Sequence, residues 1–308
     1  MKPKQKSKVY HLSCGKWLDK NEFVHYFEKK VKYTIRKFSL IDKDDRIAVA
    51  FSGGKDSLTL LYVISKICKE RNQEIIALAI EEGIGEYRTE LLEEGKKFCK
   101  KLGIPLKIFN FKKELGFNLA DKKIQNKIKK LKLTNCHVCS ILKRWLLNKK
   151  ARELKCTIIA TAHSLDDEAE SILLNQLKGN PELLAKLGPK TGIAETKAFV
   201  QRVKPFYLCR TNEIVLYAQL NKLPIPKGKS ICPLRGTTLR IEIRSWLNAL
   251  ETNYIETKNA IVRSFLKIMP LLKERYKDKE FKKCRRCGEA ASQEYCKACL
   301  ILKELKSD

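Results

Sequence analysis

The stretch that decides the fold reads Ile47-Ala48-Val49-Ala50-Phe51-Ser52-Gly53-Gly54-Lys55-Asp56-Ser57. Its first five residues are apolar, which is typical of a buried strand in a parallel sheet. The next six form a glycine-rich turn, and an amphipathic helix is expected over residues 56–70. Because unpaired N–H groups and the dipole at a helix start attract the same anion, this turn predicts a phosphate site.

The composition of the turn narrows the kind of phosphate site. Glycines at positions 53 and 54 allow the main chain to approach phosphate oxygens closely. The turn lacks the Walker spacing, so it does not imply a grip on a γ-phosphate for transfer. A plain strand-to-helix turn is the alternative for any double glycine, but Asp56 and Ser57 in this context favour nucleotide binding.

Outward from the turn, short apolar runs alternate with amphipathic segments. We expect strands at residues 47–51, 75–80, 106–111 and 157–162, and helices near 56–70, 86–102 and 138–154. This alternation predicts an α/β fold with a doubly wound parallel sheet, whose ligand crevice lies beyond the carboxyl ends of the strands. The turn after Phe51 and the segment after Ala162 both fall there.

The chain is expected to divide into four regions. These are residues 1–42 with a basic tail and a helix at 22–40, the nucleotide-binding domain at 43–205, a helical region at 206–281, and a cysteine module at 282–308. In the helical region we expect helices near 212–221, 239–250 and 258–276, and a proline-containing connection at 223–229. His25 on the first helix is expected to pack against the core rather than bind metal.

The net charge of the chain indicates the kind of partner that it binds. The 64 Lys and Arg residues exceed the 35 Asp and Glu residues, which leaves a formal net charge of +29. Such a field attracts a polyanion and indicates nucleic acid. A lysine-rich thermophile surface is the alternative, but glutamate does not balance the lysine here. Residues 121–132 are lysine-dense and form either a phosphate-contacting helix or loop, or a solvated face.

The chain has 12 cysteines. Residues 1–9 lack an apolar signal-peptide core and no apolar run is long enough to span a bilayer, so we expect a cytoplasmic protein with reduced thiols and no membrane segment. Clustered cysteine then indicates metal rather than disulfide. Four isolated cysteines are expected to behave as small buried hydrophobes: Cys68, Cys99, Cys156 and Cys209.

Two cysteine sets carry the metal signal. Cys136-His-Val-Cys139 fits a redox dithiol, half of a zinc site, half of a cluster site or two buried thiols, and Cys232 lies on a polar connection from which it could reach the crevice. Three thiolates can hold an iron–sulfur cluster and leave one iron without a protein ligand. The C-terminal set has the spacing of a four-thiolate zinc site and comprises Cys284, Cys287, Cys296 and Cys299.

A second acidic segment, His163-Ser-Leu-Asp166-Asp167-Glu168, leaves a strand and enters a helix, where acids are also ordinary capping residues. Together these motifs resemble the pyrophosphate-loop enzymes that adenylate substrates, and within them the tRNA 2-thiouridine synthetases for positions 54 and 34. The likeness covers nearly the whole chain. It implies a nucleotide site formed by Ala50, Ser52, Gly53, Gly54, Lys55, Asp56, Ser57, Ile80, Lys143, Ala162 and Asp167.

The resemblance also implies the roles of these residues. Asp56, Lys143 and Asp167 would be catalytic, with Asp56 near Mg²⁺. Ala162 replaces the usual glycine and narrows the space near adenine. The cluster would be a 4Fe-4S cluster on Cys136, Cys139 and Cys232.

The implied reaction is ATP-dependent adenylation of O2 of a tRNA uridine, followed by replacement of that oxygen with sulfur delivered through the cluster. The sulfur would come from a ubiquitin-like carrier protein, and relatives of this kind act as homodimers. Cys232-Pro233 and the basic helix after it favour position 54 over position 34. The alternatives are a tRNA 2-thiocytidine synthetase and a nonenzymatic, zinc-stabilised RNA-binding protein.

The N-terminus departs from this family, whose members carry a zinc finger there. This chain has His11 and Cys14, but Asp19 and Glu22 stand where the second ligand pair is expected. Carboxylates are uncommon in closed structural zinc sites. We therefore expect Zn²⁺ at this end to be weak or lost.

Overall fold

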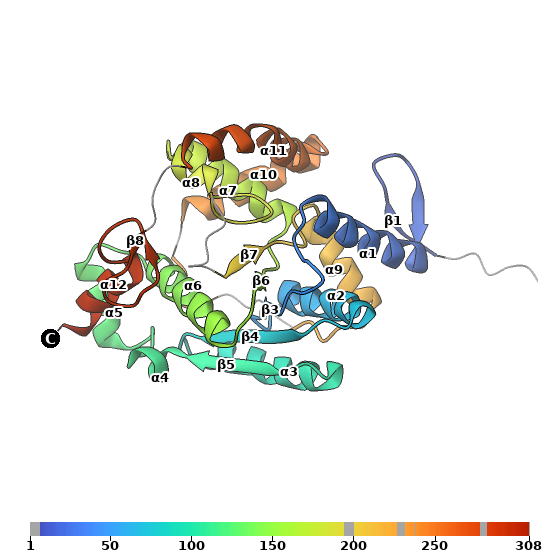
Figure 1. Cartoon of the computed structure of the whole chain (residues 1–308). Coiled ribbons are helices and arrows are strands. Elements are labelled where there is room, and N and C mark those ends of the chain that lie inside the picture. Colours follow the sequence, from blue (N-terminus) through green and yellow to red (C-terminus); the bar gives the residue numbers. More distant parts are fainter. Residues whose placement is uncertain (1–6, 194–199, 227–231, 237, 278–281, 308) are drawn as a thin grey trace, which may run out of the picture.

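The computed structural model describes residues 7–193, 200–226, 232–236, 238–277 and 282–307 (Figure 1). Its centre is a parallel sheet of five strands in the order β5-β4-β3-β6-β7. The strands are β3 (Ile47–Ala50), β4 (Ile75–Glu81), β5 (Leu106–Asn110), β6 (Ile158–Ala160) and β7 (Gln201–Val203). The sequence predicted the first four of these strands, and β7 is an addition. The predicted fold class is confirmed.

Helices cover both faces of the sheet (Figure 1). One face packs on α1 (Lys20–Lys37), α2 (Lys55–Arg71), α3 (Glu86–Leu102) and α9 (Thr211–Leu220). The other packs on α4 (Phe111–Leu115), α5 (Lys122–Lys130), α6 (Asn135–Glu153) and α12 (Lys297–Lys306). Because side chains alternate along a strand, Ala77 and Ala79 of β4 join the first cluster, whereas Leu78 and Ile80 join the second.

A third apolar cluster lies beyond the edge strand β7 and joins four helices. They are α7 (Leu165–Leu177), α8 (Pro181–Ala185), α10 (Leu239–Asn253) and α11 (Thr257–Arg275). The two long basic helices predicted from the sequence are α10 and α11, so that prediction is confirmed. Of the predicted connection at 223–229, residues 227–229 lie outside the described residues.

Each end of the chain forms a small hairpin. At the N-terminus, β1 (Lys8–His11) pairs with β2 (Trp17–Asp19). At the C-terminus, β8 (Lys282–Lys283) pairs with β9 (Ala290–Ala291) and precedes α12, which packs on α5 and α6 (Figure 1). The lysine-dense segment is the helix α5, which buries Ile124 and Ile128. Its contact with phosphate stays a prediction.

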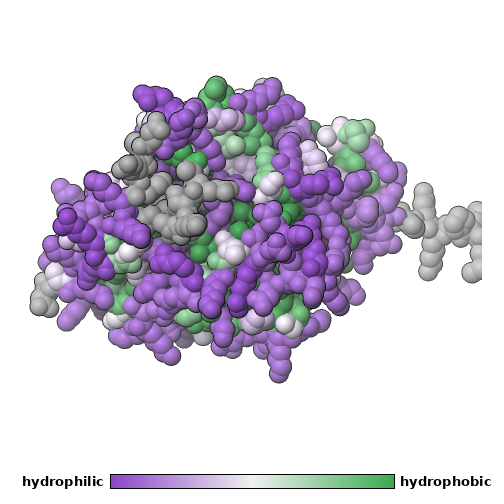
Figure 2. All heavy atoms as spheres, in the orientation of Figure 1, coloured by the Kyte–Doolittle hydropathy of each residue, from purple (hydrophilic) through white to green (hydrophobic). Residues whose placement is uncertain are grey.

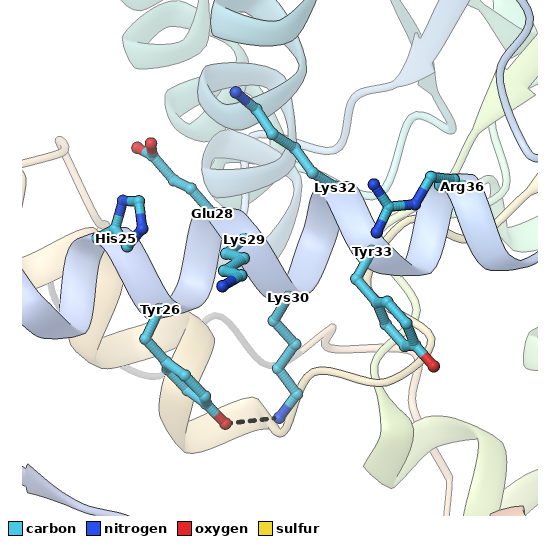
Figure 3. A pocket seen from close by; sticks show the side chains of 8 residues that line it. All are labelled: His25, Tyr26, Glu28, Lys29, Lys30, Lys32, Tyr33 and Arg36. Atoms are coloured by element: carbon cyan, nitrogen blue, oxygen red, sulfur yellow. Dashed lines mark hydrogen bonds between the residues drawn. The ribbon is translucent and has the colours of Figure 1, made fainter.

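A buried carboxylate holds the N-terminal hairpin and α1 against α9. Glu213, which is 1% exposed, accepts hydrogen bonds from the hydroxyls of Tyr10 and Tyr26 and from Lys30 Nζ. Lys30 Nζ also donates a hydrogen bond to the Tyr26 hydroxyl (Figure 3). Both side chains line a surface cavity of about 640 Å³. His25 lines the same cavity and is exposed, so the expectation that it packs in the core was wrong.

Hydrophilic side chains cover most of the face shown in Figure 2, and apolar residues form only small patches there. Among the described residues, no helix has the length and apolar character needed to cross a membrane. The four cysteines predicted to be small hydrophobes are all buried, as expected: Cys68, Cys99, Cys156 and Cys209.

Candidate nucleotide and metal sites

The glycine-rich turn joins β3 to α2 at the carboxyl edge of the sheet. Gly53 has φ +75°, and a Cβ there would lie 2.5 Å from the carbonyl oxygen of Leu91, so only glycine fits. Ser57 Oγ accepts from the N–H of Ser52 at 3.1 Å and donates to the carbonyl of Gly54 at 3.0 Å, which fixes the curve of the turn. Gly54 caps α2 without a side-chain hydrogen bond, so backbone N–H groups at this helix start are available to an anion.

Two carboxylates at this turn, Asp56 and Asp167, are close enough for their charges to interact. Asp56 forms an ion pair with Lys55 at 2.6 Å. Burial raises the pKa of Asp56, and the negative charge of Asp167 at the start of α7 raises it further. A divalent cation between the two carboxylates would remove this repulsion, so the donor set fits the Mg²⁺ expected from the sequence.

The Asp167 carboxylate is positioned by contacts with its own helix start and with α10. Its Oδ2 accepts from the N–H of Ser164 at 2.9 Å, which closes a capping box at the start of α7. Its Oδ1 lies 3.5 Å from Arg244 of α10, and Arg244 also binds Glu170 at 2.6 Å. The sequence predicted the capping geometry of Asp167 but gave no sign of Arg244, because no local motif links residues so far apart along the chain.

A buried ion-pair network lies beside the turn, on the face of the sheet covered by α6. Glu82, which follows β4 and is 2% exposed, pairs with Arg88 at 3.1 Å and with Lys143 of α6. Arg88 also donates to the carbonyls of Ser52 and, at 2.9 Å, Ile80. Lys143 is therefore linked to the glycine-rich turn through Glu82 and Arg88. Neither Glu82 nor Arg88 belongs to a motif, so the sequence did not predict a role for either residue.

Of the adenosine-bordering residues expected from the sequence, Ala50 is the last residue of β3 and Ile80 is the last but one of the neighbouring strand β4. The Ile80 side chain is buried beneath α6, and its backbone carbonyl accepts from Arg88. Ala162 is partly buried and precedes His163. The His163 ring is open to solvent yet closely surrounded by protein, and its Nδ1 lies 3.0 Å from Thr161 Oγ1. Desolvation lowers the pKa of His163, and the positive charge of Lys204 lowers it further.

Cys136 and Cys139 lie in the first two turns of α6, and Lys143 follows Cys139 by one turn. Burial raises the pKa of Cys139 to about 11, and the charges of Glu82, Cys232 and Cys136 add to the rise while Lys143 opposes it. The three thiols are thus close enough to act on one another, and all three are half-buried. In the described part of the chain they do not form a group with every sulfur within 4.8 Å of the others.

That spacing bears on which metal group fits. One metal ion requires its ligand atoms to gather tightly around a single centre. In a cluster each thiolate binds a different iron, so the sulfur atoms stand further apart. Three half-buried thiols that act on one another but do not crowd together fit a cluster better than a single zinc ion.

The C-terminal cysteines have the opposite arrangement. The sulfur atoms of all four lie within 4.8 Å of one another, a geometry that fits one tetrahedral Zn²⁺. Burial would raise the pKa of Cys284, but donation from backbone N–H groups, that of Cys296 first, lowers it to about 6. Glu289, which is 3% exposed, accepts from Asn148 of α6 at 2.5 Å and pairs with Arg152, so the module is fixed to α6.

Comparison with known proteins places these sites in a family. The PP-loop domain model matches residues 24–227. A tRNA-5-methyluridine(54) 2-sulfurtransferase from Pyrococcus horikoshii is 36% identical over 283 residues, which cover 92% of this chain and 86% of the relative. The chain belongs to the tRNA 2-thiouridine synthetase family of PP-loop proteins. The family expected from the sequence is confirmed.

Two further members of this PP-loop family are informative. The cytoplasmic tRNA 2-thiolation protein 1 of Drosophila melanogaster is 33% identical over 94% of this chain and 83% of its own length. The structure of the U34-tRNA thiolase NcsA from Methanococcus maripaludis, solved with its [4Fe-4S] cluster, is 30% identical with a TM-score of 0.82. That match covers 100% of this chain and 96% of the solved chain.

The N-terminal hairpin uses its carboxylates for another purpose. Asp19 accepts from the N–H of Glu22 at 2.9 Å and Glu22 accepts from the N–H of Asp19 at 2.9 Å, so both close the capping box of α1. The His11 ring lies 4.7 Å from that of Trp17, and Cys14 is exposed. Weak Zn²⁺ binding at His11 and Cys14 stays a prediction.

Proposed function

We propose that this protein is an ATP-dependent tRNA uridine 2-sulfurtransferase that uses a [4Fe-4S] cluster. The observation that best supports the proposal is the position of Lys143 between the glycine-rich turn and the cysteines of α6. Lys143 pairs with Glu82, which also holds Arg88 against the phosphate turn, and its positive charge acts on Cys139. One lysine thus connects the nucleotide turn with the three thiols, so an activated nucleotide and incoming sulfur can meet in one crevice.

The residues of the crevice support a two-stage reaction. In the first stage, the uridine O2 attacks the α-phosphorus of ATP and pyrophosphate leaves, held by the N–H groups of the turn. Asp56 and Asp167 would hold the Mg²⁺ that neutralises the phosphates. In the second stage, sulfur bonds to C2 and AMP leaves with the former O2 oxygen. When bound by Cys136, Cys139 and Cys232, a cluster would supply that sulfur.

Lys143 has a separate role in this proposal. Negative charge develops on the phosphate as AMP departs, and a preorganised cation stabilises such charge. Release from Glu82 would allow the ammonium group to turn toward that charge, while Glu82 stays paired with Arg88. Lys143 is half-exposed, so this rotation requires no rearrangement of the core.

Several finer features belong to the same proposal. We propose position 54 as the target, supported by the name of the Pyrococcus relative, with position 34 assayed beside it because the solved thiolase acts on U34. We also propose a ubiquitin-like sulfur carrier as donor, a homodimeric assembly, and action in the cytoplasm, where the Drosophila relative is named to act. The structural zinc is proposed on Cys284, Cys287, Cys296 and Cys299.

Reconstitution tests the function. The protein, purified and loaded with iron and sulfide without oxygen, is incubated with ATP, Mg²⁺, sulfide and an unmodified tRNA transcript. We expect one 2-thiouridine per released AMP and pyrophosphate, located by mass spectrometry of nuclease fragments. Cys232→Ala should lose cluster absorbance and thiolation, whereas the matched control Cys14→Ala should lose neither, because Cys14 is exposed and outside both cysteine sets.

The same assay separates the alternatives. Formation of 2-thiocytidine instead would show a thiocytidine synthetase. An RNA that binds but stays unmodified, with no pyrophosphate release, would show a nonenzymatic RNA-binding protein and defeat the proposal.

A further inference from the structure

Two arginines from different elements lie near each other on the α6 face of the sheet. The side-chain oxygen of Asn148 on α6 accepts from the N–H of Val200 at 2.9 Å, so α6 and the start of β7 lie side by side. Arg144 precedes Asn148 by one helical turn and therefore lies on the same face of α6. Arg202 follows Val200 by two residues, and Val200 packs in the apolar cluster beneath α6. Because strand residues alternate, Arg202 also faces α6.

Both guanidinium groups are open to solvent but crowded by protein. Arg144 is exposed and Arg202 is half-buried. Burial lowers the pKa of each group, and the charge of Arg144 further lowers that of Arg202, to about 10. Two positive groups that repel each other and are partly desolvated form an environment that an anion would stabilise.

Neither arginine has an acidic partner among the residues that the structure describes. Neighbouring cations differ in this respect. Lys204 pairs with Glu168 at 2.6 Å, Arg244 pairs with Glu170, and Arg240 lies 3.6 Å from Glu170. Within the described ranges, Arg144 and Arg202 thus have no carboxylate partner, whereas these three neighbouring cations do.

We propose that Arg144 and Arg202 form a subsite for a backbone phosphodiester of the RNA substrate. The inference rests on the proposed function and extends it from the reaction to the way the target nucleotide is held. The guanidinium fork matches phosphate oxygens in a bidentate manner, and two forks from separate elements can grip one phosphate from two sides.

The position of the pair favours RNA over ATP as the source of that phosphate. Arg202 lies on β7, two strands from β3, which carries the pyrophosphate turn. Two strand spacings amount to about 10 Å, and the turn has its own N–H donors for the nucleotide. Arg144 lies on α6, five residues beyond Cys139. A phosphate held there would be beside both the turn and the cluster thiols, where the target nucleotide must enter.

Binding measurements test the subsite. The variants are Arg202→Gln, Arg144→Gln and their combination. The matched control is Lys100→Gln, which removes one positive charge from the exposed face of α3. The probes are an unmodified tRNA transcript, titrated at several salt concentrations, and ATP with Mg²⁺, both measured with the cluster-loaded protein.

We expect Arg202→Gln to raise the Kd for tRNA about 10-fold, the scale of one charge-assisted hydrogen-bonded contact. The slope of log K against log salt should fall in magnitude by about 1, as for one lost phosphate contact. The double variant should lose less than the product of the single effects, because both arginines bind one phosphate. Lys100→Gln should change the tRNA Kd less than about 2-fold, and the ATP Kd should stay constant throughout.

Three results would overturn the subsite. One is an Arg202→Gln effect no larger than that of Lys100→Gln. Another is weaker ATP binding with unchanged tRNA binding, which would assign the pair to the nucleotide. The last is multiplicative losses in the double variant. If Arg202→Gln does not fold, Arg144→Gln decides, since Arg144 is exposed. A wild-type protein that binds tRNA through this pair but makes no 2-thiouridine would defeat the proposed reaction and leave the subsite standing.

Discussion

The two groups of cysteines in this chain are built in opposite ways. At the C-terminal module four sulfur atoms lie within 4.8 Å of one another, and three of the four residues are buried. At the crevice, three half-buried thiols interact without crowding together, and they share their surroundings with Lys143 and Glu82. A closed thiolate set suits a structural ion, whereas an incomplete, accessible set leaves room for a reaction. Stability should depend on the first and activity on the second.

The largest effect is expected at the module. Cys287→Ala should abolish bound zinc, because structural Zn²⁺ contributes about 10 kcal/mol or more to the folding of small modules and three ligands hold it poorly. Metal analysis should show the loss. Hydrogen exchange should accelerate across α12, which packs on α5 and α6. Ser292→Ala is the control, because Ser292 is an exposed residue of the module outside the four thiols. A Cys287→Ala variant that keeps both its zinc and its protected α12 would show that stability does not depend on this cysteine set.

The next effect should appear in activity alone. Asp56→Asn should slow thiolation about 10³-fold, since a metal-held phosphate loses several kcal/mol of charge stabilisation when one carboxylate is removed. Zinc content and the melting temperature should stay unchanged, and Asp44→Asn, an exposed acid before β3, is the matched control. If Asp56→Asn retains full kcat, Asp56 does not serve the reaction.

Substitutions of Glu82 and Lys143 should separate an effect on stability from an effect on activity within a single ion pair. Glu82 is 3% exposed at its side chain and Lys143 is 36% exposed. Glu82→Gln should therefore lower the free energy of unfolding by about 3 kcal/mol, because it leaves the buried guanidinium of Arg88 without its counter-ion. Lys143→Gln should lower it by less than about 1 kcal/mol, as for a partly exposed pair, and yet reduce kcat.

Urea denaturation and steady-state kinetics measure both variants of this pair. The reverse ranking, with Lys143→Gln the less stable and Glu82→Gln fully stable, would show that Glu82 is not the anchor of the network.

These sites also show how much of the structure could be predicted from the sequence. The four main strands were predictable because their apolar runs are flanked by helical periodicity, and the module because its cysteine spacing is local. The strand β7 was not, since Gln201-Arg-Val203 is short and carries a cation on its α6 face. Glu82 and Arg88 carry no motif, and their pairing arises only when α3 and α6 pack near the end of β4.

The cysteines of the crevice required a different kind of inference. Cys136 and Cys139 are far from Cys232 in the sequence, so spacing alone left several interpretations open and only the family resemblance joined them. The prediction that His25 is buried was wrong for a simpler reason. Phe23 and Phe27 define the buried stripe of α1, and a residue midway between them faces outward at 100° per residue.

The smallest expected effect concerns the helices beyond β7. There an acidic side chain, Asp166, contributes to stability by pairing with a lysine of a neighbouring helix. Asp166 pairs with Lys258 of α11 at 2.6 Å and accepts from the N–H of Thr211 at 2.8 Å. Burial alone would raise the pKa of Asp166, but the hydrogen bonds from Lys258 and Thr211 outweigh it, so the pKa lies below the ordinary value of an aspartate. A lowered folded-state pKa contributes stability above the unfolded value, and this contribution is lost as the pH falls through the folded value. Asp166→Asn should thus cost about 1 kcal/mol at pH 7 and almost nothing near pH 2, measured by urea denaturation at each pH. A cost that does not change with pH would mean that packing rather than charge joins α7 to α11.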